Sequence, residues 1–207
     1  MGFRKSLKTR LKPRLQDWAM RFMDDLRPDT VCDAEGEVLE VGFGTGRNLR
    51  HYPSAVKSVT GVDPLVTEGF AAVDARIAEA SFPVTRTALR ADGALPFDAG
   101  RFDCVITTWT LCSIPDATAA LAEMRRVLKP GGRYVFIEHG VAERASTARW
   151  QDRLNPLWRR LTDGCNINRP IDRLVAGVGF ELTSLDRFRA KGPGILAQMY
   201  RGVATRR

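Results

Sequence analysis

The chain has 207 residues, of which 44% are hydrophobic, 27% charged and 8% aromatic, and its formal net charge at pH 7 is +8. This composition is typical of a globular domain and excludes a disordered or fibrous protein. No apolar run approaches the roughly 18 residues of a membrane-spanning helix, and the basic N-terminus lacks the apolar stretch of a secretory signal.

Residues 1–27 form a basic amphipathic segment that accounts for most of the net charge, with eight Lys and Arg residues against three Asp. Apolar side chains recur there at helical spacings of three and four, namely Phe3, Leu7, Leu11, Leu15, Trp18, Phe22 and Leu26. Pro13 should interrupt the helix. We therefore divide the chain into an N-terminal segment, residues 1–30, and a domain, residues 31–207.

Two interpretations of this segment remain open. Residues 1–27 either make peripheral contact with an anionic membrane or cover the ligand pocket of the domain. We expect a division, in which residues 15–26 pack on the domain and residues 1–12 stay basic and exposed.

From residue 37 onward, short β-branched runs alternate with helix-compatible stretches. Strands are expected at 37–41, 56–62, 84–88, 104–108 and 133–137, and helices near 46–52, 66–80 and 116–128. This alternation predicts a parallel sheet covered by helices on both faces. Residues 180–185 and 197–203 are expected to close the sheet as a hairpin.

Residues 141–179 break this rhythm and predict an inserted lid, because long connections are commonly functional. Apolar residues fall near one helical face within it, namely Trp150, Leu154, Leu157, Trp158 and Leu161, with arginines around them. This face either caps a bound ligand or packs the helix on the core.

The glycine loop is the most informative motif. Val41-Gly42-Phe43-Gly44-Thr45-Gly46 leads out of a strand with glycines at alternate positions. Glycine accepts a positive φ and has no side chain, so a ligand can lie against bare backbone. The dinucleotide-binding spacing G-x-G-x-x-G would need a glycine at position 47, where this chain has Arg47.

This loop resembles motif I of the class I S-adenosylmethionine (SAM)-dependent methyltransferases. Four further stretches follow in the family's order, namely Gly61-Val62-Asp63, Asp92-Gly93, Phe102-Asp103 and Lys129-Pro130-Gly131-Gly132. The resemblance implies a Rossmann-like α/β fold with a seven-stranded, mostly parallel sheet and a C-terminal antiparallel hairpin. It also implies SAM as cofactor and S-adenosylhomocysteine as product. It places the cofactor at Glu40, Gly42, Gly44, Gly46, Asp63, Asp92, Gly93 and Thr108.

The chemistry of SAM agrees with these carboxylates. SAM carries a sulfonium, an ammonium, a carboxylate and a ribose diol but no phosphate, so its site needs hydrogen-bond acceptors more than an anion-binding helix end. The resemblance places Asp63 at the ribose and Asp92 beside the adenine. Glu40 suits an ammonium, or alternatively serves as a structural acceptor.

From residue 108 onward the chain is similar to one branch, the methyltransferase-like 7 proteins. The matching stretches are Leu111-Cys112-Ser113-Ile114, Glu138-His139, Trp150-Gln151, Asn155-Pro156-Leu157-Trp158 and Asp163-Gly164-Cys165. The resemblance implies S-methylation of alkyl thiols and association with membranes or lipid droplets. Those proteins begin with a long hydrophobic anchor, whereas this chain begins with a basic segment. The acceptor-pocket candidates are Trp109, Cys112, Trp150, Trp158 and Cys165.

Acid–base chemistry also favours a thiol as the small, fairly apolar acceptor. Deprotonation at pH 7 costs roughly 2 kcal/mol for a thiol and about 4.6 kcal/mol for an alkylamine. His139 is the candidate base, since strand ends face the ligand crevice of an open α/β sheet, although a structural imidazole is an equal alternative. Other acceptors remain open, namely a phospholipid, a quinone or another small molecule methylated at N, O or C. A non-catalytic SAM-binding protein is the remaining alternative.

Cysteine spacing and charge distribution bear on other partners. The four cysteines, at positions 32, 104, 112 and 165, show no zinc-ribbon spacing and no disulfide framework. We therefore expect a reduced, cytoplasmic protein without a metal, with peripheral membrane contact as an open alternative. Little charge excess exists outside residues 1–27, so nucleic acid is not an expected partner.

Overall fold

A computed structural model describes residues 14, 15, 17–63, 70–89, 93–162 and 164–207. Most of the basic segment and Asp92 lie outside the described residues. The N-terminal half of the segment, expected to be exposed, therefore stays a prediction.

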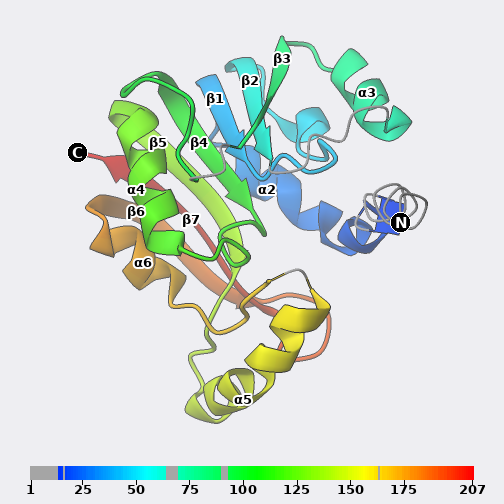
Figure 1. The fold of residues 1–207 in the computed structure, drawn as a ribbon, viewed down its shortest axis with the longest axis vertical. Coiled ribbons are helices and arrows are strands. Elements are labelled where there is room, and N and C mark those ends of the chain that lie inside the picture. Colours follow the sequence, from blue (N-terminus) through cyan, green and yellow to red (C-terminus); the bar gives the residue numbers. More distant parts are fainter. Residues whose placement is uncertain (1–13, 16, 64–69, 90–92, 163) are drawn as a thin grey trace, which may run out of the picture.

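The predicted sheet is confirmed. Its strands are β1 Gly36–Val41, β2 Val56–Asp63, β3 Val84–Ala88, β4 Phe102–Thr108, β5 Leu128–His139, β6 Phe180–Arg189 and β7 Gln198–Arg206. They form a seven-stranded sheet in the order β3-β2-β1-β4-β5-β7-β6 (Figure 1). All neighbouring pairs from β3 to β5 are parallel, and β7 runs antiparallel to both β5 and β6.

The helical elements are η1 Arg21–Leu26, α2 Arg27–Val31, η2 Leu49–His51, α3 Ala71–Ala78, α4 Ala117–Val127, α5 Ala145–Leu161 and α6 Ile171–Gly177. The helix predicted near 46–52 is wrong, since only the short 3-10 turn η2 forms there. Tyr52 is already extended, with ψ 136°, because it precedes Pro53. No helix in the described part of the chain is long and apolar enough to cross a membrane.

Two apolar clusters cover the two faces of the sheet. Strand residues such as Leu39 and Val105 pack with α4 and α6 on one face. Their chain neighbours Val38 and Cys104 pack with Val31, Leu49 and Val73 on the other. Successive strand residues point to opposite faces, so each strand between the helical layers is buried on both sides.

The N-terminal segment packs on the domain through a face that differs from its apolar stripe. Leu15, Trp18 and Phe22 are exposed by more than half. Met20 and Met23 pack instead against the cluster of Trp109, Ile137 and Met199. Residues 15–26 therefore pack on the domain as expected, but of the apolar stripe within that range only Leu26 takes part in the packing.

Helix α5 also has its apolar stripe in solvent, on the projection at the bottom of Figure 1. The exposed residues are Trp150, Leu154, Leu157 and Leu161. Positions spaced by four, three and four fall within about 60° of one another around a helix. Of the stripe's predicted members, only Trp158 turns inward.

Buried polar side chains hold α5 in place. The Gln151 amide donates to the carbonyl oxygens of Gly140, Ile167 and Ile195 and accepts from the amide of Ala142. Asn155 accepts from the amide of Ile167. These bonds satisfy the irregular backbone of the insertion, so the polar face of α5 is its inner face.

Candidate functional site

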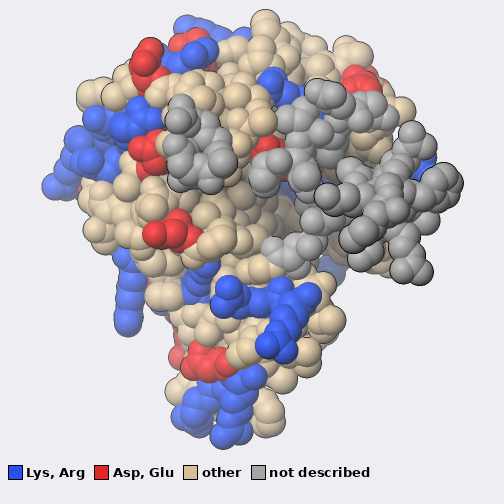
Figure 2. Space-filling model, viewed as in Figure 1, with Lys and Arg blue, Asp and Glu red and all other residues tan. Residues whose placement is uncertain are grey.

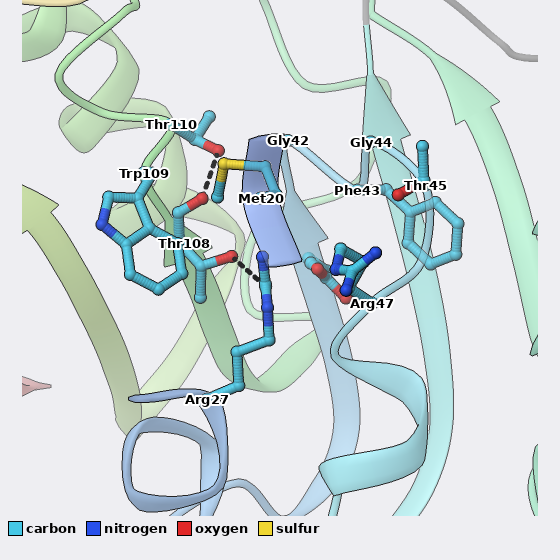
Figure 3. A pocket seen from close by; sticks show the side chains of 11 residues that line it. Met20, Arg27, Gly42, Phe43, Gly44, Thr45, Arg47, Thr108, Trp109 and Thr110 are labelled. Carbon is cyan, nitrogen blue, oxygen red and sulfur yellow. Dashed lines mark hydrogen bonds between the residues drawn. The ribbon is translucent and has the colours of Figure 1, made fainter. Parts of the chain in front are cut away.

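A pocket opens at the carboxyl ends of β1 and β4 (Figure 3). It is lined by Met20, Arg27, Glu40, Gly42, Phe43, Gly44, Thr45, Arg47, Thr108, Trp109 and Thr110. The glycine loop, the end of β4 and the N-terminal segment therefore contribute to one site. Four of the predicted cofactor residues, Glu40, Gly42, Gly44 and Thr108, lie in it.

The glycine loop is shaped for close approach of a ligand. Gly42, Gly44 and Gly46 all have positive φ. A Cβ on Gly42 would lie 2.0 Å from the Thr110 Oγ1, so this glycine lets the two loops meet. A Cβ on Gly44 would have only the Gly42 carbonyl oxygen within 4 Å, at 3.9 Å. The space beside Gly44 is thus open for a ligand.

Asp63 braces this loop from the end of β2. Its Oδ2 accepts a hydrogen bond from the Gly44 amide at 2.9 Å. The carboxylate that the resemblance places at the ribose diol therefore lies directly beside the glycine backbone. A diol needs acceptors of this kind, so the position fits the adenosyl part of SAM.

Glu40 is buried beneath the loop. Its Oε1 accepts from Asn48 Nδ2 at 2.7 Å, and its Oε2 accepts from the Tyr52 hydroxyl at 2.9 Å. Burial raises the pKa of the Glu40 carboxyl to about 7, although these hydrogen bonds and the charge of Arg27 oppose the rise. Glu40 therefore accepts hydrogen bonds within this network and also lines the pocket, and its charge changes near neutral pH.

This pKa predicts a pH-dependent affinity for SAM. The cationic groups of SAM favour the ionised carboxylate, which is about one tenth populated at pH 6 and about nine tenths at pH 8. Calorimetric titration should show SAM binding about tenfold tighter at pH 8. In the variant Glu40→Gln the affinities at the two pH values should agree within about twofold, and an unchanged pH dependence would refute this role.

The sequence prediction missed the arginine at the floor of the pocket. Arg27 is buried, and its Nη1 donates to Asn48 Oδ1 at 2.7 Å and to Thr108 Oγ1 at 3.4 Å. Its guanidinium also lies over the Trp109 ring, 5.0 Å from the centroid. Trp109 has a positive φ of 52°, which is uncommon for a side chain of this size. A buried guanidinium suits the carboxylate of a bound amino acid.

Ion pairs fasten the N-terminal segment to the glycine loop. The Asp17 carboxylate accepts from Thr45 Oγ1 at 2.7 Å, Arg47 Nη1 at 2.9 Å and Arg76 Nη1 at 2.7 Å. Burial opposes ionisation, but these hydrogen bonds hold the pKa of Asp17 well below its ordinary value of 3.8. The segment thus forms one wall of the pocket.

The variant Asp17→Asn should destabilise the protein by about 3 kcal/mol, because two arginines lose a buried partner. Urea unfolding measures this loss. The matched control is Asp29→Asn, because the exposed Asp29 carboxylate pairs with Arg201. This substitution should lower the free energy of unfolding by less than about 0.5 kcal/mol. Since the folded pKa is lowered, the contribution of Asp17 is present above pH 3.8 and is lost as the pH falls below it. Equal stabilities of the two variants would contradict this account.

A second group of side chains lies where β4 and β5 end. The sulfur atoms of Cys112 and Cys165 are 3.5 Å apart, and His139 Nδ1 lies 3.8 Å and 3.7 Å from them. Both cysteines are buried, and neither forms a disulfide. The pKa of Cys165 is lowered, because the Cys112 thiol hydrogen-bonds to it and His139 lies beside it. Sequence spacing gave no sign of this group, since its members are 26 and 27 residues apart.

The backbone of Cys112 is held on both sides. The buried Glu138 carboxylate accepts from the amides of Thr110, Leu111 and Cys112 at 2.9–3.1 Å. Asn166 donates twice to the Cys112 carbonyl oxygen, from its amide at 2.8 Å and from Nδ2 at 2.9 Å. Cys112 is therefore fixed only two residues beyond Thr110, which lines the pocket.

The structure brings together some of the predicted acceptor residues and separates others. Cys112, Cys165 and Trp158 pack in one cluster. Trp150 does not join them, since 53% of its surface is exposed and its ring stacks with Arg153. Asp92 lies outside the described residues, and Gly93 has a positive φ with open space beside it. Gly46 packs on Phe43 and Leu49 and supports the loop from behind.

Comparison with known proteins identifies relatives in one class of enzyme. Residues 39–136 match the family described as a methyltransferase domain. Human thiol S-methyltransferase TMT1A is 34% identical over 156 residues, which are 74% of this chain and 63% of that protein. Mouse thiol S-methyltransferase TMT1B is 30% identical over 174 residues, which are 78% of this chain and 69% of that protein. The chain thus spans slightly under two thirds of the human relative's length.

Solved structures share the fold. A possible histamine N-methyltransferase from Thermotoga maritima is similar with a TM-score of 0.65, covering 98% of this chain and 99% of that one. Its sequence identity is 20%, so this likeness bears on the architecture alone.

Proposed function

Since this chain belongs to the class I SAM-dependent methyltransferases, in the family of the TMT1 thiol S-methyltransferases, we propose that it methylates the sulfur atom of a small, fairly apolar thiol. SAM supplies an electrophilic methyl group on its sulfonium. The chain's task is to hold the donor, to bring the acceptor sulfur into line with it and to exclude water.

The pocket offers hydrogen-bond donors and acceptors that suit the groups of SAM. The open space at Gly44 takes the adenosyl part beside Asp63, and the buried Arg27 and Glu40 offer opposite charges for the amino-acid part. Thr108 and Trp109 close the pocket toward the end of β4. The predicted roles of Glu40 and Asp63 at the ligand remain part of this proposal.

The acceptor assignment is carried by one observation, the sulfur and imidazole group beside the pocket. Cys112 and Cys165 pack with Ile167 and Trp158 in an apolar cluster. His139 Nδ1 lies within 3.8 Å of both sulfur atoms. Apolar, polarisable surroundings suit a thiol better than a strongly hydrated amine or phosphate. A thiol also needs little help to ionise, as its deprotonation at pH 7 costs only roughly 2 kcal/mol.

A panel of acceptors with methyl-labelled SAM tests this proposal. We expect labelled product from alkyl thiols and none from phosphatidylethanolamine, a quinol or tRNA. Label on the phospholipid or the quinol, with none on thiols, would show that this compound and not a thiol is the acceptor. SAM binding without transfer to any acceptor would favour a non-catalytic role.

We also propose that the enzyme meets lipophilic acceptors at an anionic membrane surface. The exposed apolar stripe of α5 is flanked by Arg149, Arg153 and Arg160, and Figure 2 shows basic side chains gathered on this projection. A helix with apolar residues on one face and arginines beside it suits the headgroup boundary of a bilayer. The exposed Trp18 and Phe22 give the N-terminal segment a similar surface.

Vesicle co-sedimentation distinguishes this surface from an ordinary exposed patch. The double variant Trp150→Ser, Leu157→Ser should lose most binding to vesicles rich in phosphatidylserine, while Leu185→Ser on β6, also exposed, should bind like the unchanged protein. Binding should fall as salt rises. Equal sedimentation of both variants, or equal binding to neutral vesicles, would contradict the proposal.

A further inference from the structure

The group formed by Cys112, His139 and Cys165 has the shape of one face of a metal tetrahedron. Their ligand atoms lie within 4.8 Å of one another, and the three separations are 3.5, 3.7 and 3.8 Å. Zn–S bonds of about 2.3 Å and a Zn–N bond of about 2.0 Å place tetrahedral ligands about 3.8 Å apart for two sulfurs and about 3.5 Å for sulfur and nitrogen. A disulfide would need the sulfurs about 2.05 Å apart.

We propose that Cys112, Cys165 and His139 Nδ1 bind one Zn²⁺ ion and leave its fourth position to the sulfur of the acceptor thiol. Thiolate and imidazole are the ligands that Zn²⁺ commonly takes in proteins, and three protein ligands with one open position are typical of a catalytic zinc site. The part played by the acceptor rests on the thiol methyltransferase activity proposed above.

The surroundings match the charges of such a site. Two thiolates and a neutral imidazole cancel the charge of Zn²⁺, so the complex suits this buried position. A third, incoming thiolate adds one negative charge. Arg169 supplies a nearby positive charge, since its guanidinium donates to the carbonyl oxygens of Leu111 and Pro115, and Leu111 directly precedes Cys112.

The outer contacts also resemble those that hold metal ligands in place. Glu138 and Asn166 fix the backbone of Cys112. The buried Trp158 Nε1 makes no hydrogen bond of ordinary geometry within the described residues, but it lies close enough to the Cys165 sulfur to help lower the pKa of that thiol. An indole N–H beside a metal-bound thiolate gains an acceptor that a neutral thiol supplies only weakly.

In the chemical step at this site, the acceptor thiol exchanges its proton for a bond to the metal. The S–H bond of the acceptor breaks, a Zn–S bond forms, and the proton passes to solvent, because a coordinating thiol is deprotonated outright. His139 then acts as a ligand through Nδ1 instead of as the base that the sequence suggested. The sulfur keeps its electron pair for the methyl group, and no oxidant or reductant takes part.

Metal analysis of the full-length protein, purified with a phosphine reductant, tests the site without reference to activity. We expect about one zinc per chain after dialysis. Cys112→Ser, Cys165→Ser and His139→Gln should each lower zinc affinity at least about tenfold. Cys32→Ser, at an exposed cysteine outside the cluster, should bind zinc like the unchanged protein. Zinc content that does not depend on the three ligands overturns the proposal.

Substitution with Co²⁺ reports the ligands even where a variant is less stable. The reconstituted protein should show a sulfur-to-cobalt charge-transfer band in the near ultraviolet, and this band should grow when an alkyl thiol is added without SAM. If the band does not change when the thiol is added, the fourth position of the metal is not open to the acceptor and this part of the proposal is wrong. If chelator-treated, zinc-free protein still methylates thiols at full rate, the metal inference fails and the proposed function stands. If Co²⁺ and thiol bind as expected but no thiol is ever methylated, the proposed function fails and the metal site stands.

Discussion

The variant Gly44→Val is expected to lose SAM binding by at least about 100-fold, or roughly 2.7 kcal/mol. Gly44 has a φ of +55°, and the space that its missing side chain leaves open is the space assigned to the ligand. A branched side chain there fills this space. It also disfavours the positive φ at which the Gly44 amide donates to Asp63. Isothermal calorimetry with SAM measures the loss.

A control must separate the effect of backbone strain at a positive φ from the effect of a side chain that blocks the ligand. Gly100 has a similar φ of +69°, and a Cβ added there would meet nothing within 4 Å, but this glycine lies outside the pocket. Gly100→Val should therefore cost a comparable amount of stability, on the order of 1–2 kcal/mol, and change SAM affinity by less than about threefold. If both valine variants bind SAM equally well, the glycine loop is not the cofactor site.

The variant Glu138→Ala is expected to lower the free energy of unfolding by about 3 kcal/mol or more. Glu138 is fully buried, and its two oxygens accept from three backbone amides, those of Thr110, Leu111 and Cys112. Alanine leaves these amides buried without acceptors, at about 1–3 kcal/mol for each. Chemical unfolding gives the stability, and Cys112 should become more reactive toward a thiol reagent as its loop loosens.

Glutamine at position 138 separates shape from hydrogen bonding. Glu138→Gln keeps one oxygen for the two amides that Oε1 serves, but its NH₂ group meets the Cys112 amide as donor against donor. The loss of stability should be intermediate between those of the unchanged protein and Glu138→Ala. Equal stability of all three proteins would show that the carboxylate does not hold the loop.

The sheet was predictable because its signals are local. Every predicted strand occurs, since β-branched runs between turns mark strands buried on two sides. The positive φ values of the glycine loop were likewise predictable from its alternating glycines. The helix expected near 46–52 is reduced to a short turn, because Gly46 has a positive φ that a helix excludes and Pro53 holds Tyr52 extended.

Side-chain networks between distant segments were not predictable. Arg27 meets Asn48 and Thr108 across 21 and 81 residues of sequence, and no pattern in one segment marks that encounter. The faces of α5 were misread for a related reason. Its inner side is set by Gln151 and Asn155, which satisfy the backbone of the insertion, and hydrophobic periodicity takes no account of such bonds.

The identity of the atom that receives the methyl group tests the central claim most directly. The enzyme would be given SAM with a trideuterated methyl group and an equimolar mixture of three acceptors that share one alkyl chain and end in a thiol, a hydroxyl or a primary amine. Mass spectrometry should find the label on the sulfur of the thiol and on neither of the others. Label on the oxygen or the nitrogen, with the thiol unchanged, would contradict the account.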